Sequence, residues 1–186
     1  RAGGVLLGTV TDPTNGAVTF SGTTAEYVSF PDKADYDLGT KWAICVWGKI
    51  PAAPGGTQYL LSRDVTPVVA AQKTFALSIN SVRSLGFEMN DSAGTSFPLT
   101  AGAASSVSDA AKFSAVVYRN GATLAMHLDG NPTAAISRTD LVAANSNVVG
   151  AQAIFVAQNY DGTTRSGAFL GAIGLVMIMQ DFTSVA

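Results

Sequence analysis

Neither glutamate of this sequence belongs to an acidic pair with the spacing of a glycosidase. Only two glutamates, Glu26 and Glu88, occur among the 186 residues, and neither has an acidic neighbour two or four positions away. Glycosidases cleave their substrate with two carboxylates that flank the scissile bond. On a strand such a pair lies at i and i+2 or i+4, because those side chains point to the same face. The sequence therefore lacks the signature of a glycosidase.

A single histidine, His127, limits the other kinds of catalysis. Serine, cysteine and metal hydrolases combine histidine with further catalytic or ligating residues, and one histidine cannot supply a multi-histidine site. A lyase acting on an acidic sugar would need a base and a neutralising cation. His127, Tyr118 and Arg119 are the residues that could serve, but no local motif joins them. We therefore expect a protein that is not an enzyme.

Two groups of planar hydrogen-bonding residues are candidates for a ligand site. Carbohydrate sites place Asp, Asn, Arg or Gln near an aromatic face, on loops at the edge of a scaffold. The first group lies in residues 158–165 and comprises Asn159, Tyr160, Asp161 and Arg165; the second comprises Arg63, Asp64, Asn90 and Asp91. Asn, Asp and Gly are also the ordinary residues of turns, so turn chemistry is the alternative for both groups.

His127 is a further candidate ligand contact, and simple solvation of an exposed histidine is the alternative. Asp64 and Asp161 could hold a calcium ion, but calcium takes six or more oxygen ligands and the chain has no dense acidic loop. We expect no cofactor and no metal, with calcium as the exception that stays open.

The overall composition argues against several partners. The net charge is −2 and the sequence pI is about 5.2, so the chain has no basic field for nucleic acid or an anionic membrane surface. Charged residues make up 13%, about half the usual quarter. The longest apolar segment, residues 168–179, is shorter than the roughly 20 residues of a membrane span. We expect a surface of small residues, or one partly covered by neighbours, and no membrane insertion.

Cys45 is the only cysteine, which excludes an intrachain disulfide and a cysteine cluster for zinc. Since free cysteine is among the most buried residue types, we expect Cys45 to be a small buried hydrophobe. The sequence begins with Arg1 instead of Met, so we expect a processed chain or a piece of a longer one.

Runs rich in β-branched and aromatic residues recur along the chain between turn signals, and no segment shows a convincing helical period. Strands are expected at residues 17–20, 26–30, 42–50, 58–63, 74–80, 84–89, 112–118, 123–129, 133–136, 153–158 and 169–179. Residues 1–16 are expected to form an N-terminal strand or arm, and residues 99–111 a surface connection. The length fits one domain over residues 1–186.

The best-defined local prediction is a hairpin at Asn120-Gly121, where both turn residues would adopt positive φ. Alternation in the following strand puts Leu124, Met126 and Leu128 on one face and His127 on the other. This pattern is typical of two stacked sheets with one solvated side.

A series of short motifs follows one another over about residues 18–181. The motifs are Phe20-Ser-Gly, Tyr27-Val-Ser-Phe-Pro-Asp, Leu38-Gly, Trp42-Ala-Ile-Cys-Val-Trp-Gly-Lys, Leu60-Leu-Ser-Arg-Asp, Phe113-Ser-Ala-Val-Val-Tyr-Arg-Asn-Gly, Thr123-Leu-Ala-Met-His-Leu-Asp-Gly and Phe169-Leu-Gly-Ala-Ile-Gly. In their order and spacing they resemble the laminin G-like and concanavalin A-like jelly rolls. The resemblance implies an all-β, two-sheet antiparallel jelly-roll sandwich with a concave sheet and variable rim loops. It also implies that Trp42 and Trp47 are framework residues of the core. The superfamily includes lectins, pentraxins, glycosidases, adhesion modules and phage structural domains, so the resemblance does not select a function.

The last predicted strand departs from the family pattern, because both of its faces are apolar. Such a strand is either central and covered twice or lies at an interface. We expect residues 168–179 to contact a second copy of the chain or other proteins of a virion or surface assembly.

Two function classes fit these observations. The first is a non-catalytic binding module for a glycan or cell-surface receptor, carried by an adhesin or by a phage tail, fibre or decoration protein. The second is a purely structural decoration or cement protein of a virion or surface layer, and a polysaccharide-active enzyme is the third alternative. The expected location is extracellular or on a virion surface.

Overall fold

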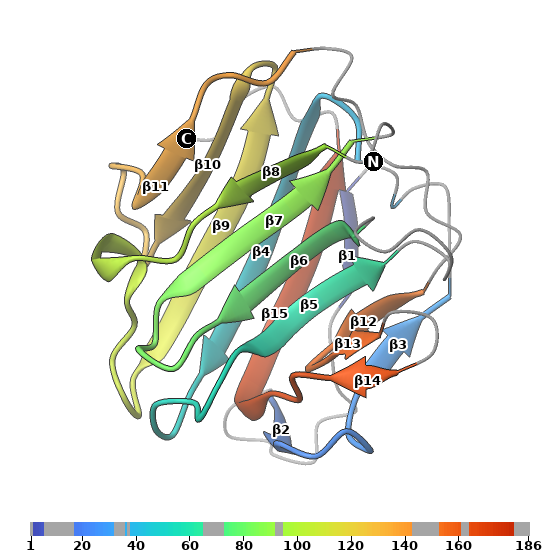
Figure 1. Cartoon of the computed structure of the whole chain (residues 1–186), viewed down its shortest axis with the longest axis vertical. Helices are drawn as coiled ribbons and strands as arrows, with labels where there is room; N and C mark the ends of the chain where they lie inside the picture. Colours follow the sequence, from blue (N-terminus) through green and yellow to red (C-terminus); the bar gives the residue numbers. More distant parts are fainter. Residues whose placement is uncertain are drawn as a thin grey trace.

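The computed structural model describes residues 2–5, 17–31, 36, 38–64, 73–91, 95–142, 153–160 and 164–180, which form two large antiparallel sheets. Figure 1 shows the six-stranded sheet in front of the seven-stranded sheet. The seven-stranded sheet has the order β1 (Ala2–Val5), β15 (Leu170–Gln180), β4 (Lys41–Lys49), β9 (Lys112–Asn120), β10 (Thr123–Leu128) and β11 (Ile136–Arg138), with β2 (Val18–Ser21) also paired to β15. The six-stranded sheet has the order β3 (Val28–Phe30), β12 (Ile154–Val156), β5 (Gln58–Asp64), β6 (Lys73–Ile79), β7 (Leu85–Asn90) and β8 (Ser96–Leu99).

Smaller elements complete the described chain. The strands β13 (Asn159–Tyr160) and β14 (Arg165–Ser166) form a separate two-stranded sheet, and η2 (Ala103–Ser105) is a turn of 3-10 helix. The described residues contain no α-helix, and accordingly none that could cross a membrane. The predicted jelly-roll sandwich is confirmed.

Each predicted strand overlaps an observed one, and β8, β13 and β14 were missed. Pro98 lies inside β8, and a proline in an apolar run argues against a central strand because it cannot donate a ladder hydrogen bond. In the structure β8 is the edge strand of its sheet, which is where proline is tolerated. The predicted connection 99–111 contains η2 and an isolated bridge between Ser84 and Ser106.

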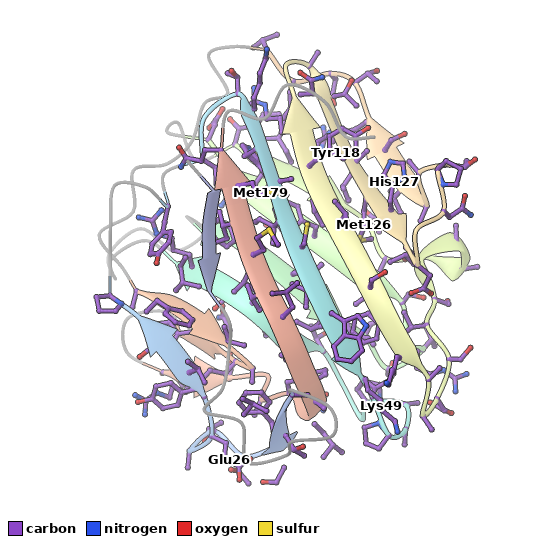
Figure 2. All side chains as sticks on the ribbon, turned by 180° about the vertical axis from the view of Figure 1, so that it is seen from behind. Glu26, Lys49, Tyr118, Met126, His127 and Met179 are labelled. Atoms are coloured by element: carbon purple, nitrogen blue, oxygen red, sulfur yellow. The ribbon has the colours of Figure 1, made fainter. Side chains whose placement is uncertain are left out.

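Apolar residues from both sheets fill the space between them. In β9 and β10 the predicted alternation is confirmed, since Phe113, Val117, Leu124 and Met126 are buried. Figure 2 shows His127 on the opposite side of β10, where it is partly exposed. The interior is therefore a conventional sandwich core.

The β9–β10 hairpin forms one residue later than predicted. Asn120 pairs with Thr123, so the two turn residues are Gly121 and Ala122. Only Gly121 has a positive φ, of 61°. Glycine at the first turn position is the type II′ arrangement, whereas the predicted Asn-Gly turn would have been type I′.

Two predictions about β4 are wrong. Trp42 is fully buried and its ring lies 5.7 Å from that of Phe87, as expected for a core residue. Trp47 and Cys45, however, are partly exposed on the outer face of the seven-stranded sheet. The five-residue spacing between the two tryptophans explains the difference, because an odd spacing puts two side chains on opposite faces of a strand.

The last strand, β15, is central in its sheet. It pairs with β4 on one side and with β1 and β2 on the other. Ile173, Val176 and Ile178 are buried between the sheets, whereas Met177 and Met179 are partly exposed on the outer face. The prediction that both faces of this strand are apolar is confirmed, and of the two alternatives the structure shows the central position. The contact of residues 168–179 with another protein stays a prediction.

Candidate functional site

A pocket of about 350 Å³ opens on the outer face of the seven-stranded sheet, where β2, β15, β4 and β9 come together. Lys49 marks this end of the sheet in Figure 2. The lining residues are Ala17, Thr19, Phe20, Trp47, Gly48, Lys49, Pro51, Lys112, Leu170, Gly171 and Ala172. We call this the Trp47 pocket. Its volume lies at the lower end of the range for small-molecule sites, about 300–1,000 Å³.

Small residues make the floor of the Trp47 pocket. Gly171 has a φ of 149°, and a Cβ atom at this position would lie 2.3 Å from the Lys49 carbonyl oxygen. A side chain would therefore clash with the neighbouring strand and with the buried Phe169 ring, 2.9 Å away. The glycine lets β15 and β4 approach closely.

The indole of Trp47 forms one wall and is fixed from two sides. A Cβ atom at Gly174 would lie 2.2 Å from Cε3 of Trp47, so the ring lies across the backbone of β15. The pairing of β15 with β4 shifts register between Ile173 and Leu175. The Trp47 ring lies at this irregularity, beside Gly174. On the other side the Lys112 ammonium lies 5.2 Å from the ring centroid, a cation–π distance.

Lys49 and Lys112 provide the charge of the pocket. They are register partners on β4 and β9, and both are exposed. Like charges directly opposite each other across strands are destabilising. Among the described residues neither lysine forms an ion pair. The pair therefore creates a local positive potential on a chain whose net charge is −2.

These groups suit a particular kind of ligand. An aromatic wall accepts an apolar ring face, the Thr19 hydroxyl can donate or accept a hydrogen bond, and two ammonium groups attract an anionic substituent. The described lining contains no carboxylate and no histidine, so it offers no acid–base pair. The described lining therefore offers groups that suit binding and none that suit acid–base chemistry.

The second predicted group of ligand residues is largely buried. Arg63 is fully buried and its Nη1 donates a hydrogen bond to the Tyr36 carbonyl oxygen at 2.6 Å. Asn90 and Asp91 are also buried, and the Asp91 carboxylate accepts a hydrogen bond from the Thr95 backbone nitrogen at 2.8 Å. This contact is the turn chemistry that was the alternative for these residues. The side chain of Asp64 lies outside the described part of the structure.

The first predicted group belongs to the β13–β14 hairpin. Asn159 is buried, whereas Arg165 is exposed, donates a hydrogen bond to the Tyr27 hydroxyl at 2.7 Å and lies over the Tyr27 ring. Asp161 and the side chain of Tyr160 lie outside the described residues, so ligand binding and a calcium ion at these positions remain predictions. In the described part of the chain no group of three or more His, Cys, Asp or Glu residues could hold a metal ion.

The residues considered for a lyase are only partly brought together. Tyr118 and His127 stack on the outer face with ring centroids 5.5 Å apart, and the Asn131 carbonyl oxygen accepts a hydrogen bond from His127 Nδ1 at 2.9 Å. Arg119 points to the opposite face and is fully buried. It donates hydrogen bonds to the carbonyl oxygens of Gly121 at 3.0 Å and Val142 at 2.9 Å, and its burial lowers the pKa of the guanidinium. The base and the cation therefore do not meet.

The two glutamates, Glu26 and Glu88, do not form a catalytic pair either. Glu26 accepts a hydrogen bond from the backbone nitrogen of Ser21 beside the seven-stranded sheet, which lowers the pKa of its carboxyl group. Glu88 lies on the six-stranded sheet and accepts a hydrogen bond from the Ser96 hydroxyl at 2.9 Å. Each carboxylate has a local structural partner instead of a catalytic one.

Comparison with known proteins finds matches by structure but not by sequence. No family model and no curated protein sequence matches the chain. The structure is similar to Ruminococcus gnavus IT-sialidase CBM40 bound to alpha2,6 sialyllactose, with a TM-score of 0.66, 17% identity and coverage of 86% of this chain and 92% of that one. It is also similar to the NanB sialidase of Streptococcus pneumoniae (TM-score 0.71, 16% identity, 91% and 26% coverage) and to domains LG4-5 of the mouse laminin alpha1 chain (TM-score 0.66, 14% identity, 89% and 42% coverage).

The chain has a concanavalin A-like jelly-roll fold. At these identities the likeness concerns the fold, and it confirms the resemblance seen in the sequence motifs. On this jelly roll the Trp47 pocket combines an aromatic wall with two lysines that form no ion pair among the described residues.

Proposed function

We propose that the protein is a non-catalytic carbohydrate-binding module that recognises an acidic sugar in the Trp47 pocket. The observation that carries the proposal is the pair Lys49 and Lys112, which face each other beside a partly exposed indole without a counter-ion among the described residues. A sugar carboxylate would relieve the repulsion between the ammonium groups while its ring packs on Trp47.

The pocket favours the end of a glycan over its interior. Beyond the lysines, the outward side chains around Trp47 are those of Cys45, Ser114, Val116, Leu175 and Met177. Only the Ser114 hydroxyl among them is a strong hydrogen-bonding group. Each further sugar placed along this face would lose hydrogen bonds to water without regaining them. We therefore expect one or two terminal residues to be bound and the rest of the glycan to leave toward solvent.

The fold similarity supports this proposal. The CBM40 structures contain alpha2,6 and alpha2,3 sialyllactose, so this type of sandwich serves as a module that binds a sialylated glycan in those proteins. Sialic acid carries the carboxylate that the lysine pair would attract. The positive charge of the pocket thus agrees with the acidic sugar in the ligands of these structural neighbours.

The biological setting follows as part of the same proposal. A module for terminal glycans would act outside the cell or on a virion surface, as part of an adhesin or of a phage tail, fibre or decoration protein. The absence of a carboxylate or histidine from the described pocket lining supports binding without catalysis.

A structural decoration or cement protein is the second candidate function. The observation that favours it is the apolar outer face of β15, β4 and β9, because a face of this kind is common at protein interfaces. The two candidates differ in whether the isolated chain binds a glycan.

Calorimetric titration with sialyllactose and with lactose tests the proposed function, since the two ligands differ by the acidic sugar. We expect sialyllactose to bind more tightly, and Lys49→Ala, Lys112→Ala and Trp47→Ala each to weaken binding about tenfold or more. Lys41→Ala removes an exposed lysine from the other end of β4 and is the matched control. Equal affinity for lactose, or no loss in the pocket variants, would refute the proposal. A glycan array without any hit would favour the structural candidate.

A further inference from the structure

Leu170 is an exposed apolar side chain in the lining of the Trp47 pocket. Three large hydrophobic residues are exposed in the described part of the chain, Val82, Val142 and Leu170, and of these only Leu170, 40% exposed, lines the pocket. An exposed apolar residue needs no explanation when it stands alone. Inside a pocket it is different, because a ligand that covers the exposed part of the leucine gains binding free energy.

Strand register sets the polar groups of the pocket in one row. Ala172 of β15 is the partner of Lys49 on β4 and of Thr19 on β2, and Lys49 is in turn the partner of Lys112 on β9. All four residues line the pocket. The row therefore has two ammonium groups at one end and the Thr19 hydroxyl at the other.

Two apolar walls lie on either side of this row. The Trp47 ring lies beside Gly174, which follows Ala172 along β15, whereas Leu170 precedes Ala172 by two residues. Both walls belong to the pocket lining, so they face the same space from opposite directions along the strand. A ligand above Ala172 would meet an indole on one side and a leucine on the other.

The position of Leu170 is fixed in the ligand-free protein. Its backbone nitrogen donates a hydrogen bond to Gln58 Oε1 at 3.0 Å, and strand pairing sets the residue opposite Ser21. Gly22 lies against the side chain, since a Cβ atom at that position would be 3.3 Å from the Leu170 Cβ atom. Because the wall is in place before binding, a ligand that contacts it loses little free energy to ordering the site.

We propose that Leu170 and Thr19 select, among acidic sugars, those that carry an acylamino group. The inference rests on the proposed function, because it concerns the ligand of the same pocket. Leu170 pairs with Ser21, so Leu170 and Thr19 are diagonal neighbours across the β2–β15 pair and within reach of one substituent. The Thr19 hydroxyl can bond the amide while the acyl methyl group covers Leu170, and the carboxylate meets the lysines at the other end of the row. A hydroxyl in place of the acylamino group would lose hydrogen bonds to water against Leu170.

Calorimetric titration with two matched ligands tests this selection. The methyl α-glycosides of N-acetylneuraminic acid and of deaminoneuraminic acid differ only in the acetamido group, which a hydroxyl replaces in the second. We expect the unmodified chain to bind the acetamido ligand about threefold to tenfold more tightly, the gain from covering the exposed part of one leucine with a methyl group. Leu170→Ala should bring this ratio close to one, and Leu170→Met, which keeps the apolar volume, should retain most of it. Thr19→Val removes the hydroxyl at similar volume and should lower the ratio in part.

The affinity ratio separates this inference from the proposed function. Lys49→Ala should weaken both ligands by the same factor, since both carry the carboxylate, and Val82→Ala is the control for truncating an exposed apolar residue outside the pocket. Equal affinities in the unmodified chain, or a ratio that survives Leu170→Ala, would overturn the selection and leave the acidic-sugar function standing. Failure of both ligands to bind would overturn the two proposals together. The comparison on the unmodified chain needs no substitution, so it decides the result if a variant does not fold.

Discussion

Gly174 provides the seat for the indole of Trp47: the six-membered ring lies where a side chain at position 174 would begin. We expect Gly174→Ala to displace the ring, weaken sialyllactose binding and destabilise the fold by about 1–3 kcal/mol, as overpacking does. Tryptophan fluorescence and urea unfolding would measure the two effects. Gly55→Ala is the control, since a Cβ atom there meets nothing within 4 Å. An unchanged emission spectrum and affinity would contradict this description of the pocket wall.

Lys49 and Lys112 should lower the stability of the ligand-free protein. Removing one charge by Lys49→Ala is expected to raise the free energy of unfolding by about 0.2–1 kcal/mol, because the cross-strand repulsion disappears. The gain should shrink at high salt, which screens exposed charges. Lys41→Ala is the control, since Lys41 pairs with the uncharged Asn120. Urea unfolding at two salt concentrations measures the stability of both variants. A lower stability of Lys49→Ala would contradict the prediction, because it would mean that Lys49 makes a stabilising interaction that outweighs its repulsion from Lys112.

Cys45 should react slowly with thiol reagents in the folded protein. Burial raises the pKa of its thiol, so less of the reactive thiolate is present at mildly alkaline pH than in the unfolded chain. The comparison is between native and denatured protein at low protein concentration, with a colorimetric thiol reagent. The rate in the native state should rise as the pH approaches the raised pKa. Equal rates in the two states would mean that the thiol is more accessible than the structure shows.

Arg119 should be among the most sensitive charged positions of the chain. Its guanidinium is buried and donates hydrogen bonds to the Gly121 and Val142 carbonyl oxygens, so Arg119→Leu would leave buried acceptors without these donors and cost about 2–4 kcal/mol. Arg83→Leu is the matched control, because the Arg83–Asp109 ion pair is exposed and such pairs contribute little. Thermal or urea unfolding would measure both variants, and equal losses would contradict the structural role of Arg119.

The strands of this fold were predictable because the turn residues and the alternation of β9 and β10 are local signals. Strand order was not, because the pairing of β15 with β1, β2 and β4 joins segments from both ends of the chain. Pro98 concealed an edge strand, since the same residue excludes a central strand and permits an edge one.

The Trp47 pocket was missed for a similar reason. It combines β2, β15, β4 and β9, which no spacing in the sequence connects. One signal was available: Trp42 and Trp47 are five residues apart, so if one tryptophan faces the core the other must face outward. The predicted residues were chosen because their side chains suit a binding site, and Arg63, Asn90, Asp91 and Asn159 proved to be buried.

The pairing of β1 with β15 has a mechanical consequence. The two strands are antiparallel, and Ala2 at the start of β1 lies opposite Met179 near the end of β15. Tension that pulls Ala2 and Met179 apart would therefore break the hydrogen bonds between the strands one after another, instead of loading all of them at once. The Trp47 pocket lies at the opposite end of β15, where Leu170–Ile173 pair with β2. A pull transmitted through these two strands would therefore peel β1 away first and reach the pocket last, so the site could keep hold of its ligand while the far end of the sheet yields.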